Sequence, residues 1–173
     1  MKVSGLEEIT QSVIEAVDNA SNGIMKIYNS NVVHVKDKND GSPVTEADKE
    51  SHRILVSALE FIDKNIPILS EEGYKQKDNI DLFWLIDPLD GTKEFINRNN
   101  EFTCNLALIE NNKATLGFVG IPSQELIYYG GKIFGSKSVN RFNKINDIKY
   151  KSKSSIFIAL NSSEGFSSER SIN

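Results

Sequence analysis

Residues 82 to 95 constrain the fold most, because an apolar run passes there directly into acidic and turn-forming residues. Leu82-Phe83-Trp84-Leu85-Ile86 is typical of a buried strand, and the chain continues as Asp87-Pro88-Leu89-Asp90-Gly91-Thr92-Lys93-Glu94-Phe95. A strand that ends in this way presents two carboxylates, a backbone carbonyl and the amides of a Gly-Thr turn. Those groups can hold a divalent cation and a phosphate together. We therefore expect the chemistry of the chain at the end of this strand.

Composition limits the partners that the chain can bind. Its 173 residues are 39% hydrophobic, which suits one globular domain or a domain with an attached piece. The formal charge of −4 provides no broad cationic surface for a nucleic-acid polymer or a membrane. Cys104 is the only cysteine, so an internal disulfide is excluded and a reducing compartment is favoured. We expect a soluble, cytoplasmic protein that acts on a small molecule.

Two helices are predicted from apolar residues at helical spacing. The first runs from Leu6 to Ile27 and follows the capping-box sequence Ser4-Gly5-Leu6-Glu7. The second begins at Thr45-Glu46-Ala47-Asp48, which also has capping-box form, and ends near Lys64.

Short β-rich runs account for most of the remaining chain. The run from Ile66 to Ser70 ends in Glu71 and Glu72, so a second strand ends in carboxylates. The other runs are residues 32–35, 102–109, 114–121, 125–129 and 155–160, with turn-forming or charged segments at 36–41, 73–81 and 144–153. The runs from 102 to 129 predict an antiparallel meander. Helices followed by a meander predict a layered α+β fold, with the helices packed on the sheet.

Glu71, Asp87 and Asp90 form a candidate metal site at these strand ends. Hard cations such as Mg²⁺ prefer oxygen ligands and retain several waters, so few protein ligands suffice. The Leu89 carbonyl adds a further oxygen, and ions about 4 Å apart could bind a phosphate and activate water. The alternative is a turn at a strand end with ordinary solvated acids. An isolated Asp-Pro-x-Asp favours that alternative, whereas the whole stretch from Asp87 to Phe95 favours the metal site.

Gly91, Thr92 and Lys93 form a candidate phosphate site. Thr92 is predicted to N-cap a short helical turn whose amides face the phosphate, and its hydroxyl can bind a water or a phosphate oxygen. A simple capped surface turn is the alternative. Asp48 likewise has two alternative interpretations. It caps the second helix, which its spacing favours, or it orients an attacking water together with Thr92.

A phosphoaspartyl mechanism is excluded at this site. The haloacid dehalogenase pattern Asp-x-Asp-Gly-Thr requires a nucleophilic aspartate two residues before Asp90, where this chain has Pro88. Water is therefore the expected nucleophile.

Four segments resemble, in the same order, the inositol monophosphatase superfamily. They are Ser42 to Asp48, Pro67 to Glu72, Trp84 to Ile96 and Glu101 to Ile109. The sequence Lys93-Glu94-Phe95 after Asp-Gly-Thr is most similar to the branch of the CysQ-type 3'(2'),5'-bisphosphate nucleotidases. The resemblance implies an αβαβα sandwich fold and a Mg²⁺-dependent phosphatase that converts 3'-phosphoadenosine 5'-phosphate to AMP. Inositol monophosphates and sugar phosphates are the alternative substrates.

The resemblance also implies roles for individual residues. Two or three Mg²⁺ ions would be held by Glu71, Asp87, the Leu89 carbonyl and Asp90, with Glu72 as a supporting residue. Asp48 and Thr92 would arrange the nucleophilic water. Gly91, Thr92 and Lys93 would meet the phosphate.

The sequence departs from the superfamily after Leu160. Residues 1–153 resemble a metal-binding N-terminal α+β domain, and residues 154–173 resemble the first strand and helix start of a truncated C-terminal α/β domain. A further acidic metal ligand of that domain is missing from the 173 residues. We therefore expect a weakly active or inactive chain that self-associates through its exposed domain seam, and the alternative is a non-catalytic metal-binding remnant.

Overall fold

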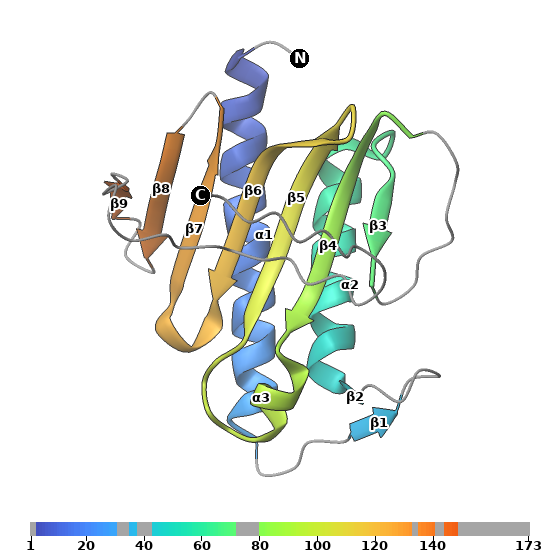
Figure 1. Ribbon diagram of the computed structural model, residues 1–173, viewed down its shortest axis with the longest axis vertical. Coiled ribbons are helices and arrows are strands. Elements are labelled where there is room, and N and C mark those ends of the chain that lie inside the picture. Colours follow the sequence, from blue (N-terminus) through green and yellow to red (C-terminus); the bar gives the residue numbers. More distant parts are fainter. Residues whose placement is uncertain are drawn as a thin grey trace, which may run out of the picture.

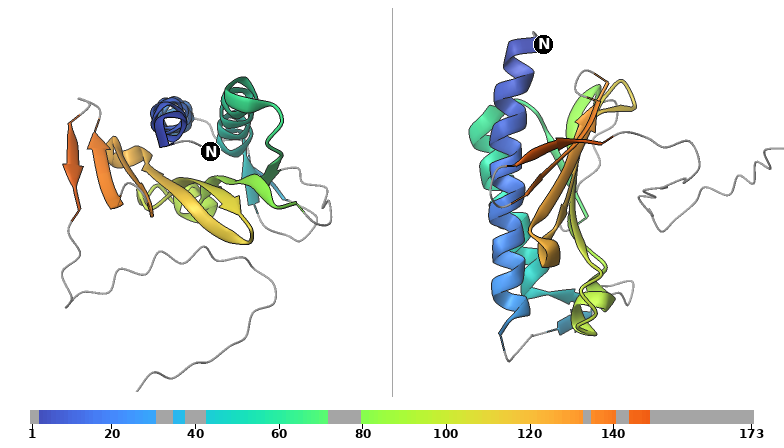
Figure 2. Two further views of the ribbon diagram at one scale, coloured as in Figure 1. Left: turned by 90° about the horizontal axis from the view of Figure 1, so that it is seen from above. Right: turned by 90° about the vertical axis from the view of Figure 1, so that its left-hand side faces the viewer.

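Two long helices cover one face of a single large sheet in the computed structural model (Figures 1 and 2). The structure describes residues 3–30, 35–37, 43–71, 80–132, 135–140 and 144–148. The predicted strand at 155–160, the boundary at residue 153 and Glu72 lie outside these ranges. Within them, no helix has the length and apolarity needed to cross a membrane.

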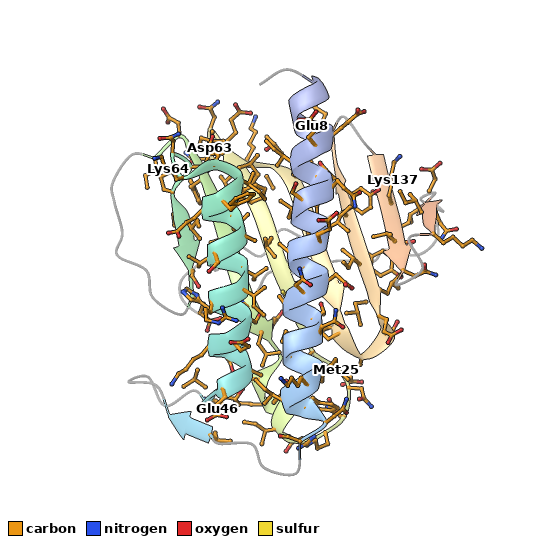
Figure 3. The ribbon with its side chains drawn as sticks, turned by 180° about the vertical axis from the view of Figure 1, so that it is seen from behind. Glu8, Met25, Glu46, Asp63, Lys64 and Lys137 are labelled. Carbon is orange, nitrogen blue, oxygen red and sulfur yellow. The ribbon has the colours of Figure 1, made fainter. Side chains whose placement is uncertain are left out.

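Helices α1 (Val3–Tyr28) and α2 (Glu46–Asp63) run in opposite directions. Figure 3 shows Glu8 and Asp63 at one end of the pair, and Met25 and Glu46 at the other. The apolar stripe of α1 is fully buried at Val13, Val17, Ala20 and Ile24. The predicted cap at Ser4 is wrong, because α1 already includes Val3. The capping box at the start of α2 is confirmed.

Seven strands form the main sheet, in the order in which they occur in the chain. Their bounds are β3 (Ile68–Ser70), β4 (Leu82–Asp90), β5 (Thr103–Glu110), β6 (Lys113–Ile121), β7 (Leu126–Gly131), β8 (Gly135–Asn140) and β9 (Ile145–Asp147). A 3-10 turn, η1 (Pro122–Gln124), connects β6 to β7. The predicted meander and the layered α+β fold are confirmed, although the sheet is mixed because β3 pairs with β4 in parallel.

Strand β4 continues further than its sequence predicts. It was expected to end at Ile86, but it pairs with β5 as far as Asp90, with an irregular register between Asp87 and Asp90. A register irregularity lets a strand accommodate a proline, which cannot donate to the ladder. The acids therefore lie within the last residues of the strand, where the pairing with β5 fixes their backbone.

The core lies between the helices and the sheet. The inward face of the sheet presents Trp84, Ile86, Leu106 and Phe118, each at most 3% exposed. Gly120 allows α1 to approach closely, because a Cβ at this position would lie 2.7 Å from Cγ1 of Val17. The first helix is thereby fixed on the middle of the sheet.

A small second sheet lies at the end of the molecule where α3 (Thr92–Ile96) is found (Figure 1). It consists of β1 (Val35–Asp37) and β2 (Pro43–Thr45), which pair antiparallel. Lys36 and Asp37 were predicted to lie in a turn, and this is wrong because both pair with β2. The segment predicted as a solvated edge at 144–153 contains β9, whose described residues are all exposed.

Candidate active site

Strands β3 and β4 bring the predicted metal ligands to one end of the sheet. Their parallel pairing aligns Ser70 with Ile86, and the Glu71 amide donates to the Ile86 carbonyl at 3.4 Å. Glu71 follows Ser70 and Asp87 follows Ile86, so the two acids come directly after one aligned pair of residues. Glu71 and Asp90 are exposed and Asp87 is half-buried.

Asp48 uses its two carboxylate oxygens for different purposes. Oδ2 accepts hydrogen bonds from the Thr45 amide at 2.7 Å and the Thr45 hydroxyl at 2.6 Å, which caps α2. Oδ1 accepts from the Thr92 hydroxyl at 3.2 Å. Asp48 is only 2% exposed. The two interpretations of Asp48 therefore do not compete, because the capping contact holds one oxygen and orients the other toward Thr92.

Thr92 begins α3 but does not cap it. The N-cap residue is Gly91, so the predicted N-cap role of Thr92 is wrong. The Thr92 hydroxyl lies 3.2 Å from both Asp48 Oδ1 and the Leu89 carbonyl oxygen. A hydroxyl carries one proton and can donate to only one of these acceptors at a time.

Gly91 makes this turn possible. Its φ of 87° lies in the left-handed region, and a Cβ would lie 2.7 Å from the Glu101 carbonyl oxygen. No other residue fits this position without moving the chain before β5 or the start of α3. Lys93, the next predicted phosphate-site residue, is exposed.

An aromatic cluster anchors α3 beneath the site. Phe95 is fully buried, and its ring centroid lies 5.1 Å from that of Tyr28 and 5.2 Å from that of Phe102. The Arg98 guanidinium stacks over the Tyr28 ring at 4.8 Å. The end of α1 and the residue immediately before β5 thus hold the turn that carries Thr92.

Ser51 is a site residue that the sequence did not reveal. Its side chain is fully buried, and its hydroxyl donates to the Pro88 carbonyl at 2.7 Å. Ser51 lies on α2 one turn after Asp48, so the same helix contacts both Pro88 and Thr92. Its only signal in the sequence is a serine on the apolar face of a predicted helix.

His52 makes a further contact from α2 to the sheet. Its Nδ1 lies 2.8 Å from the Ser70 hydroxyl, immediately before Glu71. The ends of β3 and β4 are therefore both connected to the first half of α2.

Asn105 was also missed as a site residue. It lies opposite Asp87 in the pairing of β4 with β5, and its Nδ2 donates to Asp90 Oδ2 at 3.4 Å. The residue is 6% exposed. Its signal is a polar side chain at an interior position of an otherwise apolar strand.

The pKa of the Cys104 thiol reflects its buried position close to Asp87 and Ser51. The pKa of Cys104 is raised to about 12, mainly by burial, with the Ser51 contact opposing the rise and the nearby Asp87 charge adding to it. The Ser51 hydroxyl lies 3.8 Å from Cys104 Sγ. The thiol is therefore neutral at ordinary pH and is not a nucleophile.

The oxygen donors at this end suit a hard divalent cation, but they are loosely gathered. Within the residues that the structure describes, no group of three His, Cys, Asp or Glu side chains lies close enough to hold a metal ion. A buried amide oxygen, Asn105 Oδ1, nevertheless has no hydrogen-bond partner among the described residues. Carboxylates and this amide are the donors that Mg²⁺ or its waters bind, so the donor set fits such an ion. The ligand roles of Glu71, Asp87, Leu89 and Asp90 remain predictions.

The layered fold and the site define a class of protein, because solved structures of inositol monophosphatase-like proteins share this architecture. CysQ from Bacteroides thetaiotaomicron, "a bacterial member of the inositol monophosphatase family", superposes with a TM-score of 0.66 at 30% identity and covers 86% of this chain and 53% of that one. An IMPase/NADP phosphatase complexed with Mg²⁺ and phosphate superposes with a TM-score of 0.68 at 20% identity. That match covers 76% of this chain and 50% of the other, and it shows the fold alone.

The chain belongs to the inositol monophosphatase family, whose model matches residues 5–172. The 3'(2'),5'-bisphosphate nucleotidase CysQ of Salmonella typhimurium is 40% identical over 126 residues, which are 70% of this chain and 51% of that protein. The chain thus spans about half the length of the curated relatives that it matches.

Proposed function

We propose that the chain is a Mg²⁺-dependent phosphomonoesterase, a 3'(2'),5'-bisphosphate nucleotidase that converts 3'-phosphoadenosine 5'-phosphate to AMP and phosphate. The observation that carries this proposal is the hydrogen bond between Thr92 and Asp48 beside the acids at the end of β4. The similarity to CysQ over 70% of the chain supports the nucleotide substrate. The Mg²⁺ and phosphate named for the related IMPase/NADP phosphatase structure support the choice of metal.

The proposed mechanism assigns the water to Asp48 and Thr92. Divalent cations held by Glu71, Asp87, the Leu89 carbonyl and Asp90 would supply charge neutralisation at the phosphate and activation of water. With the Leu89 carbonyl on a cation, the Thr92 hydroxyl would donate its hydrogen bond to Asp48 Oδ1. The Thr92 oxygen could then accept a hydrogen bond from the attacking water and orient it. The cap at Thr45 keeps Asp48 in place while this occurs.

Further parts of the proposal concern the whole protein. We propose that residues 1–153 form the metal-binding unit, that residues 154–173 belong to a second unit, and that the protein acts in the cytoplasm on a small phosphorylated molecule. The phosphate is proposed to meet the backbone at Gly91 and Thr92, with the exposed Lys93 nearby. Self-association through the exposed domain seam is proposed for the 173-residue chain.

Phosphate release tests the function. The purified chain is incubated with Mg²⁺ and either 3'-phosphoadenosine 5'-phosphate, an inositol monophosphate or a sugar phosphate. We expect weak release, fastest from the bisphosphate nucleotide, that is abolished in Asp87→Asn and Asp90→Asn. Faster release from an inositol monophosphate would instead favour the inositol monophosphatase alternative.

The alternative of a non-catalytic metal-binding chain has one observation in its favour, which is the loose gathering of acids in the described residues. Binding of Mn²⁺ without phosphate release from any of the three substrates would support this alternative. Release that survives both Asp→Asn changes would contradict the proposed site.

A further inference from the structure

We propose that Asn105 is a positioning residue for the divalent cation, which it reaches through one of the waters that the ion retains. In this arrangement, Asn105 Nδ2 orients the Asp90 carboxylate and Asn105 Oδ1 accepts a hydrogen bond from the water. The inference rests on the proposed function, because it concerns the same metal site.

Strand geometry places Asn105 on the side of the sheet where Asp87 lies. Cys104 faces the helices, as its contact with Ser51 shows, so the next residue along β5 points to the opposite face. Asn105 lies directly opposite Asp87 across the β4–β5 pair. Side chains at such positions have Cβ atoms about 5 Å apart and are neighbours on one face.

The carboxylate of Asp90 fixes the orientation of the Asn105 amide. Nδ2 donates to Asp90 Oδ2, whereas a flipped amide would place two acceptors against each other. The second amide atom is therefore Oδ1, an acceptor that faces away from Asp90. Among the described residues, no donor reaches it, and it is closed off from bulk water. A buried acceptor without a donor opposes folding, so its presence calls for a partner that arrives with a ligand.

A water on a divalent cation is the donor that suits this position. Mg²⁺ keeps several of its waters when few protein ligands bind it, and those waters are strong donors. The hydrogen bond to Asp90 is long at 3.4 Å, and Asp90 itself is exposed. The exposed Asp90 carboxylate could turn onto an ion while it stays within reach of Nδ2, and this would bring the waters of the ion beside the same amide. Partners of this kind orient metal-bound groups in other sites.

Mn²⁺ titration followed by electron paramagnetic resonance tests the inference on the 173-residue chain, alongside thermal unfolding with and without Mn²⁺. Asn105→Leu keeps the shape of the side chain but removes both polar atoms. We expect its metal-free melting temperature to be close to that of the wild type and its Mn²⁺ dissociation constant to rise roughly 10-fold or more. Thr115→Val is the matched control, because it removes a polar atom from β6, away from the acids, and should leave Mn²⁺ binding unchanged.

Asn105→Asp provides a second readout that a purely structural role would not move. A carboxylate beside Asp90 and Asp87 should lower the metal-free melting temperature, and Mn²⁺ should then raise it by more than in the wild type. If Asn105→Leu does not fold, this larger rise alone supports the inference, and an unchanged rise overturns it. Wild-type Mn²⁺ affinity in a folded Asn105→Leu overturns the role of Asn105 while leaving the proposed function intact. Failure of the wild-type chain to bind Mn²⁺ overturns both.

Discussion

The Ser51 hydroxyl donates a 2.7 Å hydrogen bond to the Pro88 carbonyl, which lies 37 residues further along the chain. This contact joins the first half of α2 to the end of β4, which carries Asp87 and Asp90. Both residues are buried, and Pro88 lies in the irregular part of the pairing between β4 and β5. The bond restrains the peptide plane between Pro88 and Leu89, directly before the Leu89 carbonyl.

Replacing Ser51 with alanine should destabilise the protein. It leaves the buried Pro88 carbonyl without its donor, which costs roughly 1–3 kcal/mol of the free energy of unfolding. Ser57→Ala, an exposed change on the same helix, should stay within about 0.5 kcal/mol of the wild type. Urea denaturation measures both values. Equal stability of the two variants would show that the Ser51 bond contributes nothing to the fold.

Asp48 and Thr92 should be energetically coupled. A double-mutant cycle with Asp48→Asn and Thr92→Val removes the shared hydrogen bond, and a bond to a carboxylate predicts a coupling of about 1 kcal/mol or more. Thr92→Ser, which keeps the hydroxyl, should retain most of the coupling. The cycle is measured by chemical denaturation, and the control pair of Asp48→Asn with Thr115→Val should be additive. Additivity of the Asp48 and Thr92 changes would contradict the contact on which the proposed mechanism depends.

Gly91→Ala should disrupt the turn before α3. An alanine at this position would have to adopt the positive φ of Gly91, which is unfavourable for it, and its Cβ would meet the Glu101 carbonyl oxygen. We therefore expect the free energy of unfolding to fall by more than about 1 kcal/mol. Gly117→Ala offers a matched control, because a Cβ there meets nothing within 4 Å. Thermal unfolding of the two variants compares them directly. A Gly91→Ala protein as stable as the Gly117→Ala protein would show that the turn relaxes without strain.

Stability should fall in alkaline solution because of Cys104. The thiol ionises at its ordinary value of 9.0 in the unfolded chain and at about 12 in the fold, so between these values the folded state binds more protons. The free energy of unfolding should therefore drop with rising pH across this window, by roughly 1.4 kcal/mol per pH unit from this group. Denaturation curves at about pH 8, 9 and 10.5 measure how steeply the free energy of unfolding falls with pH. Cys104→Ala should remove this part of the slope, and an identical slope in both proteins would contradict the assignment.

Much of the fold could be predicted because its signals are local. The capping box at Thr45 and the apolar stripe of α2 lie within a few turns of one helix, and the meander follows from apolar runs separated by turns. Asp48 was recognised for the same reason, since its capping contact is three residues away.

The remaining features depend on contacts between distant residues. Strand β4 continues through Pro88 to Asp90 because it stays paired with β5. The proline considered alone would indicate the end of the strand. Ser51 and Asn105 gain their roles only when α2 and β5 are placed beside the acids. The parallel pairing of β3 likewise depends on the crossover between the strands, and no local signal specifies it.

The position of β3 has a consequence for how long the proposed metal site stays assembled. Among the residues that the structure describes, this strand of three residues is the edge of the sheet and pairs on one side only, with β4. Edge strands with few contacts open by local unfolding more often than the whole domain unfolds. Opening of β3 would carry Glu71 away from Asp87 and leave the rest of the sheet intact. An ion that bridges the two strands would close this route, so hydrogen exchange of the Glu71 amide should slow when Mg²⁺ binds.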